Sequence, residues 1–166
     1  MKIKSASGVK VLLTMLVLSV VSPAFAAAPA DSQPLIAKRI VIIKSTHDYT
    51  QAKSTALQAS KKLGLKLKLR NLTPHKKTGL TYPAKTCNND GFEYPCYIAR
   101  GRYDDGAYIS IEHSNAFEGF AKGYYIVVIA SAADKNPIIK NVLKKAKKHY
   151  KDAYAKLSRI YIGCIH

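Results

Sequence analysis

Acidic residues are scarce in this sequence of 166 residues, which holds 10 Asp and Glu against 27 Lys and Arg and carries a formal net charge of +17. The excess charge must face solvent or an anionic partner: a cell-wall polymer, a lipid surface, a nucleic acid or an acidic protein. The alternative is that the charge only keeps the protein in solution.

The sequence also lacks the patterns of common enzymes and metalloproteins. It has no Gly-rich phosphate loop, its five histidines show no metal-ligand spacing, and no nucleophile–base pair is recognisable. Asp104 and Asp105, with Glu112 nearby, could serve glycoside hydrolysis, but Asp is common in turns for backbone reasons alone. We therefore expect a protein that is not an enzyme and that holds no metal and no cofactor.

No apolar run is long enough to span a bilayer, which needs about 20 residues. Residues 11–21 form an apolar run that follows three lysines and precedes the small-x-small stretch at 24–26, an order typical of a secretory signal. We predict that residues 1–26 are a signal peptide and that the mature protein is periplasmic or secreted, with no integral membrane segment. Export disfavours nucleic acid as a partner, and a retained anchor is the alternative.

All three cysteines follow the predicted signal. Cys87 and Cys96 bracket a turn-forming stretch, and an oxidising compartment makes a disulfide the default. We predict a Cys87–Cys96 bond, because a hairpin-like loop brings its ends together. Spacing leaves a Cys96–Cys164 bond open; otherwise Cys164 is buried near the last strand or pairs with another chain.

Hydrophobic periodicity divides the chain into two similar halves, each a strand, a helix and a strand. The predicted elements are residues 40–43, 49–63 and 65–69, then 125–129, 137–150 and 154–162. Two such halves can form one four-stranded sheet with both helices on a single face. The other face would then be bare and available for binding. Residues 27–38 are predicted to be a flexible leader, and 39–166 a single domain.

A long insert, residues 71–120, separates the two halves. Within it, the alternating segments 97–103 and 107–112 flank an Asp-Asp-Gly stretch, which is a strong hairpin signal. The insert is therefore expected to carry both the disulfide and a β-hairpin.

The first group of candidate binding residues follows the first helix. Leucines alternate there with Lys66 and Lys68, and Arg70 comes next, so the three cations share the face opposite the leucines. If the leucines meet the helices, these cations stand on the uncovered face of the sheet. The alternative is that exposed strand lysines only prevent edge pairing.

The second group lies on the predicted hairpin. Arg100 and Arg102 share one face of its first strand, with Tyr103 close by. Guanidinium groups recognise carboxylates or phosphates, and tyrosine rings stack on sugars or peptides. The alternative is an Arg–Asp ion pair that only holds the turn.

With this order of elements in place, the chain resembles a SPOR-type (sporulation-related repeat) domain. Residues 123–131, Gly-Tyr-Tyr-Ile-Val-Val-Ile-Ala-Ser, are similar to the opening strand of that family, and residues 151–156 to its helix-to-strand junction. SPOR domains are exported modules with a ferredoxin-like sheet that binds peptidoglycan glycan strands, preferably those lacking stem peptides. The resemblance implies the same ligand here, although the insert at 71–120 is longer than the family's usual linker.

The sequence thus predicts an α+β fold: a ferredoxin-like βαβ–βαβ sandwich with a four-stranded antiparallel sheet, helices on one face and an inserted β-hairpin. The expected function is non-catalytic binding of peptidoglycan glycan, or of another anionic envelope polymer, through a basic sheet face. The alternative is a protein partner, with this chain acting as an inhibitor or immunity protein that binds a cell-wall-degrading enzyme through its hairpin.

Overall fold

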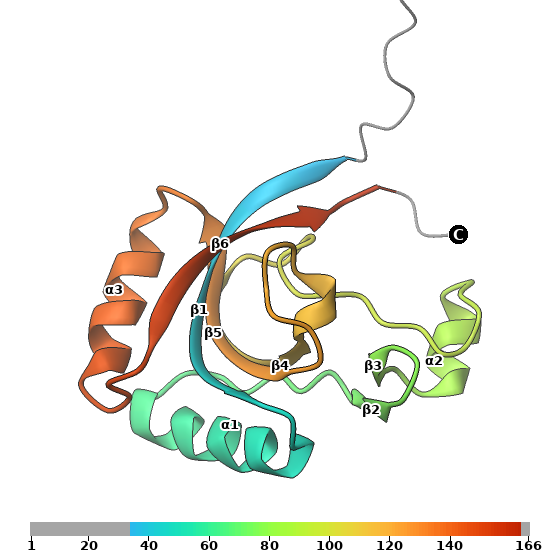
Figure 1. Cartoon of the computed structure of the whole chain (residues 1–166), viewed down its shortest axis with the longest axis horizontal. Helices are drawn as coiled ribbons and strands as arrows, with labels where there is room; N and C mark the ends of the chain where they lie inside the picture. The colour runs from blue at the N-terminus through green and yellow to red at the C-terminus, as the bar shows by residue number, and fades with distance from the viewer. Residues whose placement is uncertain (1–33, 164–166) are drawn as a thin grey trace, which may run out of the picture. The chain divides into compact units, whose positions relative to one another are not determined.

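The computed structural model describes residues 34–163 and is built on a four-stranded sheet with the strand order β4-β5-β1-β6 (Figure 1). Its strands are β1 (Leu35–Thr46), β4 (Gly106–His113), β5 (Tyr125–Ala133) and β6 (Tyr154–Tyr161). Every neighbouring pair is antiparallel, so the predicted α+β class with a four-stranded antiparallel sheet is confirmed. The predicted signal peptide and Cys164 lie outside the described residues.

Two helices connect the strands, and local capping signals in the sequence set where each begins. The helix α1 (Tyr49–Leu63) starts after Asp48, whose carboxylate accepts a hydrogen bond from the second helical N–H, and ends at Gly64 in the left-handed conformation. The helix α3 (Pro137–Lys147) starts after Asn136 in the same way. The predicted bounds of α1 are confirmed, whereas α3 ends three residues before the predicted Tyr150.

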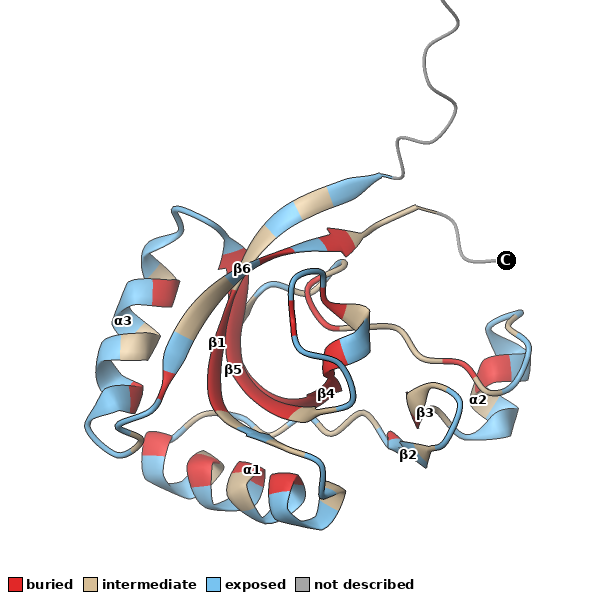
Figure 2. Cartoon of the chain, viewed as in Figure 1, coloured by how far each residue is buried: buried red, intermediate tan, exposed pale blue. Residues whose placement is uncertain are grey.

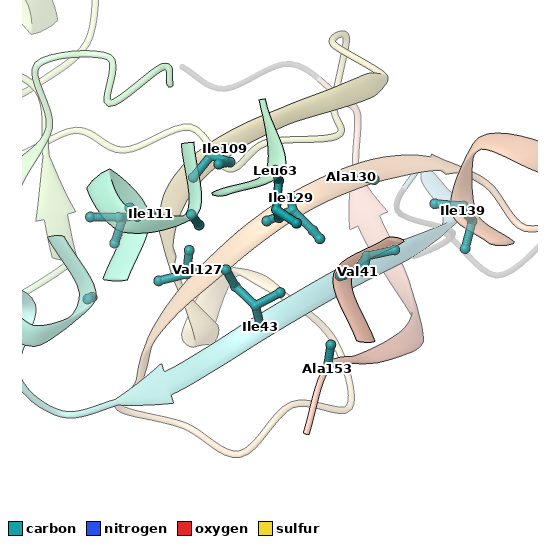
Figure 3. Packing of buried hydrophobic residues seen from close by; sticks show 14 of the residues in the cluster. Val41, Ile43, Leu63, Ile109, Ile111, Val127, Ile129, Ala130, Ile139 and Ala153 are labelled. Carbon is teal, nitrogen blue, oxygen red and sulfur yellow. The ribbon is translucent and has the colours of Figure 1, made fainter. Parts of the chain in front are cut away.

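Both helices pack on one face of the sheet, as predicted. The cluster between them contains Val41, Ile43, Leu63, Val127, Ile129 and Ile139, which Figure 3 shows together. The buried side of α1 is otherwise made of Ala52, Ala56 and Ala59, each fully buried. Such small side chains let the helix backbone approach the strands closely.

The opposite face of the sheet is covered, so the expectation of a bare face is wrong. Phe117 and Phe120, in the segment that contains the short helix η1 (Ser114–Ala116), pack there against a second apolar cluster. The strand residues of this cluster are Ile40, Ile42, Ile126, Val128 and Ile160. In Figure 2 the central lengths of β1 and β5 are buried throughout. Uninterrupted β-branched runs are typical of strands buried on both faces.

The first strand is longer than predicted. Residues 35–38, expected in a flexible leader, belong to β1 and pair with β6, with Leu35 opposite Tyr161 and Lys38 opposite Ser158. Local periodicity gave no sign of this extension, because a distant strand supplies its hydrogen bonds.

Residues 65–69 were predicted to be a strand of the sheet, and this is wrong. They form one isolated parallel bridge, Leu67 to Ile109, with backbone hydrogen bonds of 2.8 Å on either side. The segment therefore covers the outer edge of β4 over three residues only. The chain then turns away at Arg70 and Asn71, both at φ 56°. The leucines of the segment do pack against the helix-side cluster, as expected.

Although β4 lies within the insert and belongs to the main sheet, the earlier part of the insert, residues 71–96, forms a small substructure beside the sheet, on the right in Figure 1. It contains the paired strands β2 (Thr73–His75) and β3 (Gly79–Thr81) and the helix α2 (Ala84–Asn89). The Cys87–Cys96 disulfide is present, which confirms that prediction. The predicted hairpin is wrong: residues 97–103 form no strand, and β4 pairs with β5 instead.

Removing the disulfide is expected to lower the free energy of unfolding by about 2 to 3 kcal/mol, because it closes a loop with a sequence separation of nine. The test is urea denaturation of a Cys87→Ala/Cys96→Ala variant beside the wild type. Wild-type protein kept in reducing agent is the control and should match the variant. An unchanged unfolding midpoint in both would contradict the expectation.

Candidate functional site

Arg70, predicted to face a ligand, is bound to a buried carboxylate. Its Nη2 donates to both carboxylate oxygens of Glu112, at 2.7 and 2.6 Å, and its Nη1 donates to the Tyr82 hydroxyl and to the Ile98 carbonyl. Glu112 is fully buried. Burial works to lower the pKa of Arg70, but Glu112 and the neighbouring tyrosines together outweigh it, and the pKa lies above the ordinary value. Both terminal nitrogens of the Arg70 guanidinium are thus hydrogen-bonded within the fold.

The same carboxylate connects three parts of the chain. Glu112 also accepts hydrogen bonds from the Tyr97 hydroxyl at 2.6 Å and from the backbone N–H of Arg100 at 3.2 Å. Burial, followed by the neighbouring carboxylate, raises the pKa of Tyr97 well above its ordinary value. Glu112 therefore ties β4 to the segment after Leu69 and to the segment after the disulfide. Both carboxylate oxygens of Glu112 are thus bonded within the fold.

Arg100 is also internal, with 1% of its surface exposed. Its guanidinium donates to the carbonyl oxygens of Gly106 at 2.7 Å, Tyr108 at 2.7 Å and Val128 at 3.2 Å, and to Ser110 Oγ at 3.3 Å. Burial lowers the pKa of this guanidinium. Arg100 fixes the loop onto the sheet and is not available to a ligand.

Arg102 and Tyr103 lie against the chain that follows β6. Arg102 donates to the carbonyl of Gly163, and the Tyr103 hydroxyl donates to the carbonyl of Ile162 at 3.2 Å. The guanidinium of Arg102 stands 5.0 Å from the centre of the Tyr103 ring. Tyr103 is 79% exposed, so its ring is accessible.

Lys66 and Lys68 are exposed beside the edge strand β4, where Lys68 Nζ lies 4.2 Å from the centre of the Tyr108 ring. The structure therefore does not gather the six predicted binding residues into one surface. Arg70 and Arg100 are bonded within the fold, the two lysines stand beside β4, and the other two residues lie against the end of β6.

Sequence reasoning missed a group of cations where the two helices end side by side, at the lower left of Figure 1. Lys145 Nζ donates to the carbonyl of Leu63 at 2.5 Å, and Lys62 Nζ lies 5.9 Å from the centre of the Tyr150 ring. The two helix ends together contribute six exposed lysines, which we call the helix-end lysine cluster: Lys61, Lys62, Lys144, Lys145, Lys147 and Lys148. In the sequence, a lysine-rich helix face is usually only a solvated face.

The helix-end lysine cluster is not neutralised within the described chain. The four ion pairs of residues 34–163 use Lys38, Arg39, Arg70 and Arg159, and none uses a lysine of the cluster. Cations do favour helix C-termini, by about 0.3 to 1 kcal/mol. However, like charges three or four residues apart on a helix, such as Lys144 with Lys147 and Lys148, destabilise it. An anionic partner would relieve this repulsion.

His113, at the end of β4, is 6% exposed, and its Nδ1 has no hydrogen-bond partner within residues 34–163. Burial, followed by the charge of Lys122, lowers the pKa of His113. The unfolded chain, with an ordinary histidine pKa of about 6.5, therefore binds a proton more readily than the folded protein does. The stability that His113 contributes is present above pH about 6.5 and is lost as the pH falls towards its lower folded pKa.

A His113→Phe variant is accordingly expected to lose less stability than the wild type between about pH 7 and pH 5. The measurement is the free energy of unfolding in urea at three pH values across that range. A His149→Phe variant is the control, because His149 is exposed. Equal pH slopes in the wild type and the His113 variant would contradict the expectation.

Within residues 34–163, no group of three or more His, Cys, Asp or Glu side chains is placed to hold a metal ion. None of the helices described there is both long and apolar enough to cross a membrane. The chain matches no protein-family model, no curated protein and no solved structure. Its function must therefore be argued from the geometry of the molecule itself.

Proposed function

We propose that this chain is an exported, non-catalytic binding protein for an anionic polymer of the cell envelope, with the helix-end lysine cluster as its contact surface. The observation that carries the proposal is that the cluster's six exposed lysines have no ion-pair partner within residues 34–163. Ammonium groups on flexible stems suit a ligand with repeated charges, since each finds its own anion without a fixed geometry.

Peptidoglycan glycan is the polymer that the SPOR-like resemblance suggests. The strand order β4-β5-β1-β6, with both helices on one face, supports a ferredoxin-like interpretation of the fold. Because Phe117 and Phe120 cover the opposite face of the sheet, the proposed polymer contact is at the helix ends and not on the sheet. The disulfide supports a periplasmic or secreted location, where such bonds persist.

The test is co-sedimentation of the chain from Ala27 onward with purified peptidoglycan sacculi, native and amidase-stripped, at low and at physiological salt. We expect retention that rises on stripped glycan, whose carboxylates are free of peptide, and that weakens as salt rises, because exposed charges are screened. A protein that stays in the supernatant under every condition would contradict peptidoglycan as the ligand. The same assay with another anionic envelope polymer then tests the broader proposal.

The insert favours a second candidate, binding to a protein such as a cell-wall-degrading enzyme. Its earlier part, residues 71–96, lies beside the sheet, holds the disulfide and exposes 44% of Tyr94, whose ring lies 5.6 Å from that of His75. Exposed tyrosines on ordered loops are frequent hot spots of protein interfaces. Arg100, a candidate binding residue of the predicted hairpin, is buried and cannot contact a partner. Binding to a protein partner of this kind would be lost in a Tyr94→Ala variant and kept when the lysines of the helix-end lysine cluster are replaced.

A further inference from the structure

A pocket lies where the turn between β2 and β3 meets the ends of β4 and β5. Its volume is about 380 Å³, within the range of roughly 300 to 1,000 Å³ usual for small-ligand sites. The side chains that matter for its chemistry are His75, Lys76, Lys77, His113, Asn115 and Tyr125. No acidic residue is among its lining residues in the described chain.

The apolar wall of this pocket is fixed by close packing. The His113 ring lies against Gly79, at φ +76°, where a Cβ atom would fall 2.2 Å from the ring. Tyr125 donates from its hydroxyl to the Gly79 carbonyl at 3.2 Å and meets the His113 ring edge-on at 5.4 Å. The ring of Tyr49, at the start of α1, meets the Tyr125 ring edge-on, with the two ring centres 5.4 Å apart. A wall held in this way is in place before any ligand arrives.

The polar groups of the pocket are mainly donors. His75 Nδ1 accepts from the backbone N–H of Lys77 at 3.2 Å, so the proton of the neutral ring is on Nε2. Asn115 Oδ1 accepts from the N–H of Gly123 at 2.8 Å, which leaves the Asn115 amide hydrogens to donate. Lys76 and Lys77 are exposed, and Lys122 Nζ is held 3.2 Å from the Asn115 carbonyl.

We propose that this pocket binds the anionic group, a carboxylate or a phosphate, of a sugar-sized ligand. Lys76 and Lys77 supply the charge, the amide of Asn115 and Nε2–H of His75 donate hydrogen bonds, and the His113 and Tyr125 rings receive the body of the ligand. This site is independent of the proposed polymer contact. It lies near the N-terminal end of α1, whereas the helix-end lysine cluster lies at the other end of this helix, which is about 22 Å long.

The proposal is tested by NMR titration of the histidine ring signals with three probes: inorganic phosphate, glucuronate and glucose. We expect saturable shifts at His75 and His113 with at least one anion and none with glucose at the same concentration. Whichever anion binds more tightly identifies the preferred group. A Lys76→Gln/Lys77→Gln variant should bind that anion at least about tenfold more weakly.

A Lys53→Gln/Lys85→Gln variant removes the same charge from exposed positions outside the pocket and should bind as the wild type does. A variant with the helix-end lysine cluster neutralised should also keep pocket binding, which separates this inference from the proposed function. Shifts that do not saturate, equal binding of glucose, or equal weakening in the pocket and control variants would overturn the proposal.

Discussion

Replacing Glu112 with Ala is expected to lower the free energy of unfolding by about 3 to 5 kcal/mol, the range for removing one partner of a buried ion pair. Glu112 is fully buried and accepts two hydrogen bonds from Arg70, one from the Tyr97 hydroxyl and one from the Arg100 backbone. Without the carboxylate, a charged group and two polar donors lose their partner inside the protein. Denaturant unfolding followed by circular dichroism measures the loss.

A matched control is Glu118→Ala, because Glu118 also pairs with an arginine but at the surface, where both side chains are about half exposed. That change should cost less than about 1 kcal/mol. Replacing both Glu112 and Arg70 with Leu should cost less than Glu112→Ala alone, since neither charge is then left buried without a partner. A loss below 1 kcal/mol in Glu112→Ala would contradict this account of the network.

Neutralising the helix-end lysine cluster is expected to weaken binding to an anionic polymer by roughly 100-fold or more, since each lysine near an anionic surface contributes about 1 kcal/mol. The variant changes Lys61, Lys62, Lys144, Lys147 and Lys148 to Gln, which is as good a helix former as Lys. Lys145 is kept because it also binds the Leu63 carbonyl. Equilibrium binding at low salt to a fluorescently labelled polymer that the wild type retains measures the change.

Its control carries five Lys→Gln changes outside the cluster and outside the pocket, at Lys53, Lys66, Lys68, Lys85 and Lys135, all exposed. The two variants have the same net charge, so any difference between them reports the place of the charges and not their number. The cluster variant should be about as stable as the wild type, because the relief of like-charge repulsion and the loss of favourable cations at the helix C-termini are opposite and similar in size. Equal weakening in both variants would mean that the polymer responds to net charge alone.

Sequence reasoning located the central elements because each carries its own signal. The alanine face, the Asp48 cap and the Gly64 terminus define α1, and the β-branched runs define the centres of β1 and β5. The disulfide was predictable because its two cysteines are neighbours in sequence. Signals that depend on nearby residues were sufficient for these features.

The remaining errors share one physical cause, which is pairing between distant residues. Leu67 alternates like a strand residue, yet only Ile109 bridges to it and the ladder goes no further. Arg100 looked like a hairpin residue facing solvent, but its partners are backbone carbonyls, including that of Val128 on β5. Backbone carbonyls carry no sequence signature, so a buried arginine that binds them cannot be told from an exposed one.

The candidate site was missed for a related reason. Each helix showed its lysines in the sequence, but only the contact between Lys145 and Leu63 shows that the two sets of charges meet. The covered sheet face was missed because no local pattern shows that Phe117 and Phe120 pack across a face of the sheet. Both features arise from tertiary packing of segments far apart in the chain.

The most direct test of polymer binding at the helix ends is to measure which lysines the bound polymer protects. The chain from Ala27 onward would be acetylated briefly, free and bound to a polymer that it retains, and the modification of each lysine quantified by mass spectrometry. Binding through the helix-end lysine cluster predicts protection of Lys61, Lys62, Lys144, Lys147 and Lys148, with Lys66 and Lys68 as reactive as in the free protein. Protection at Lys66 and Lys68, with the helix-end lysine cluster still reactive, would contradict it.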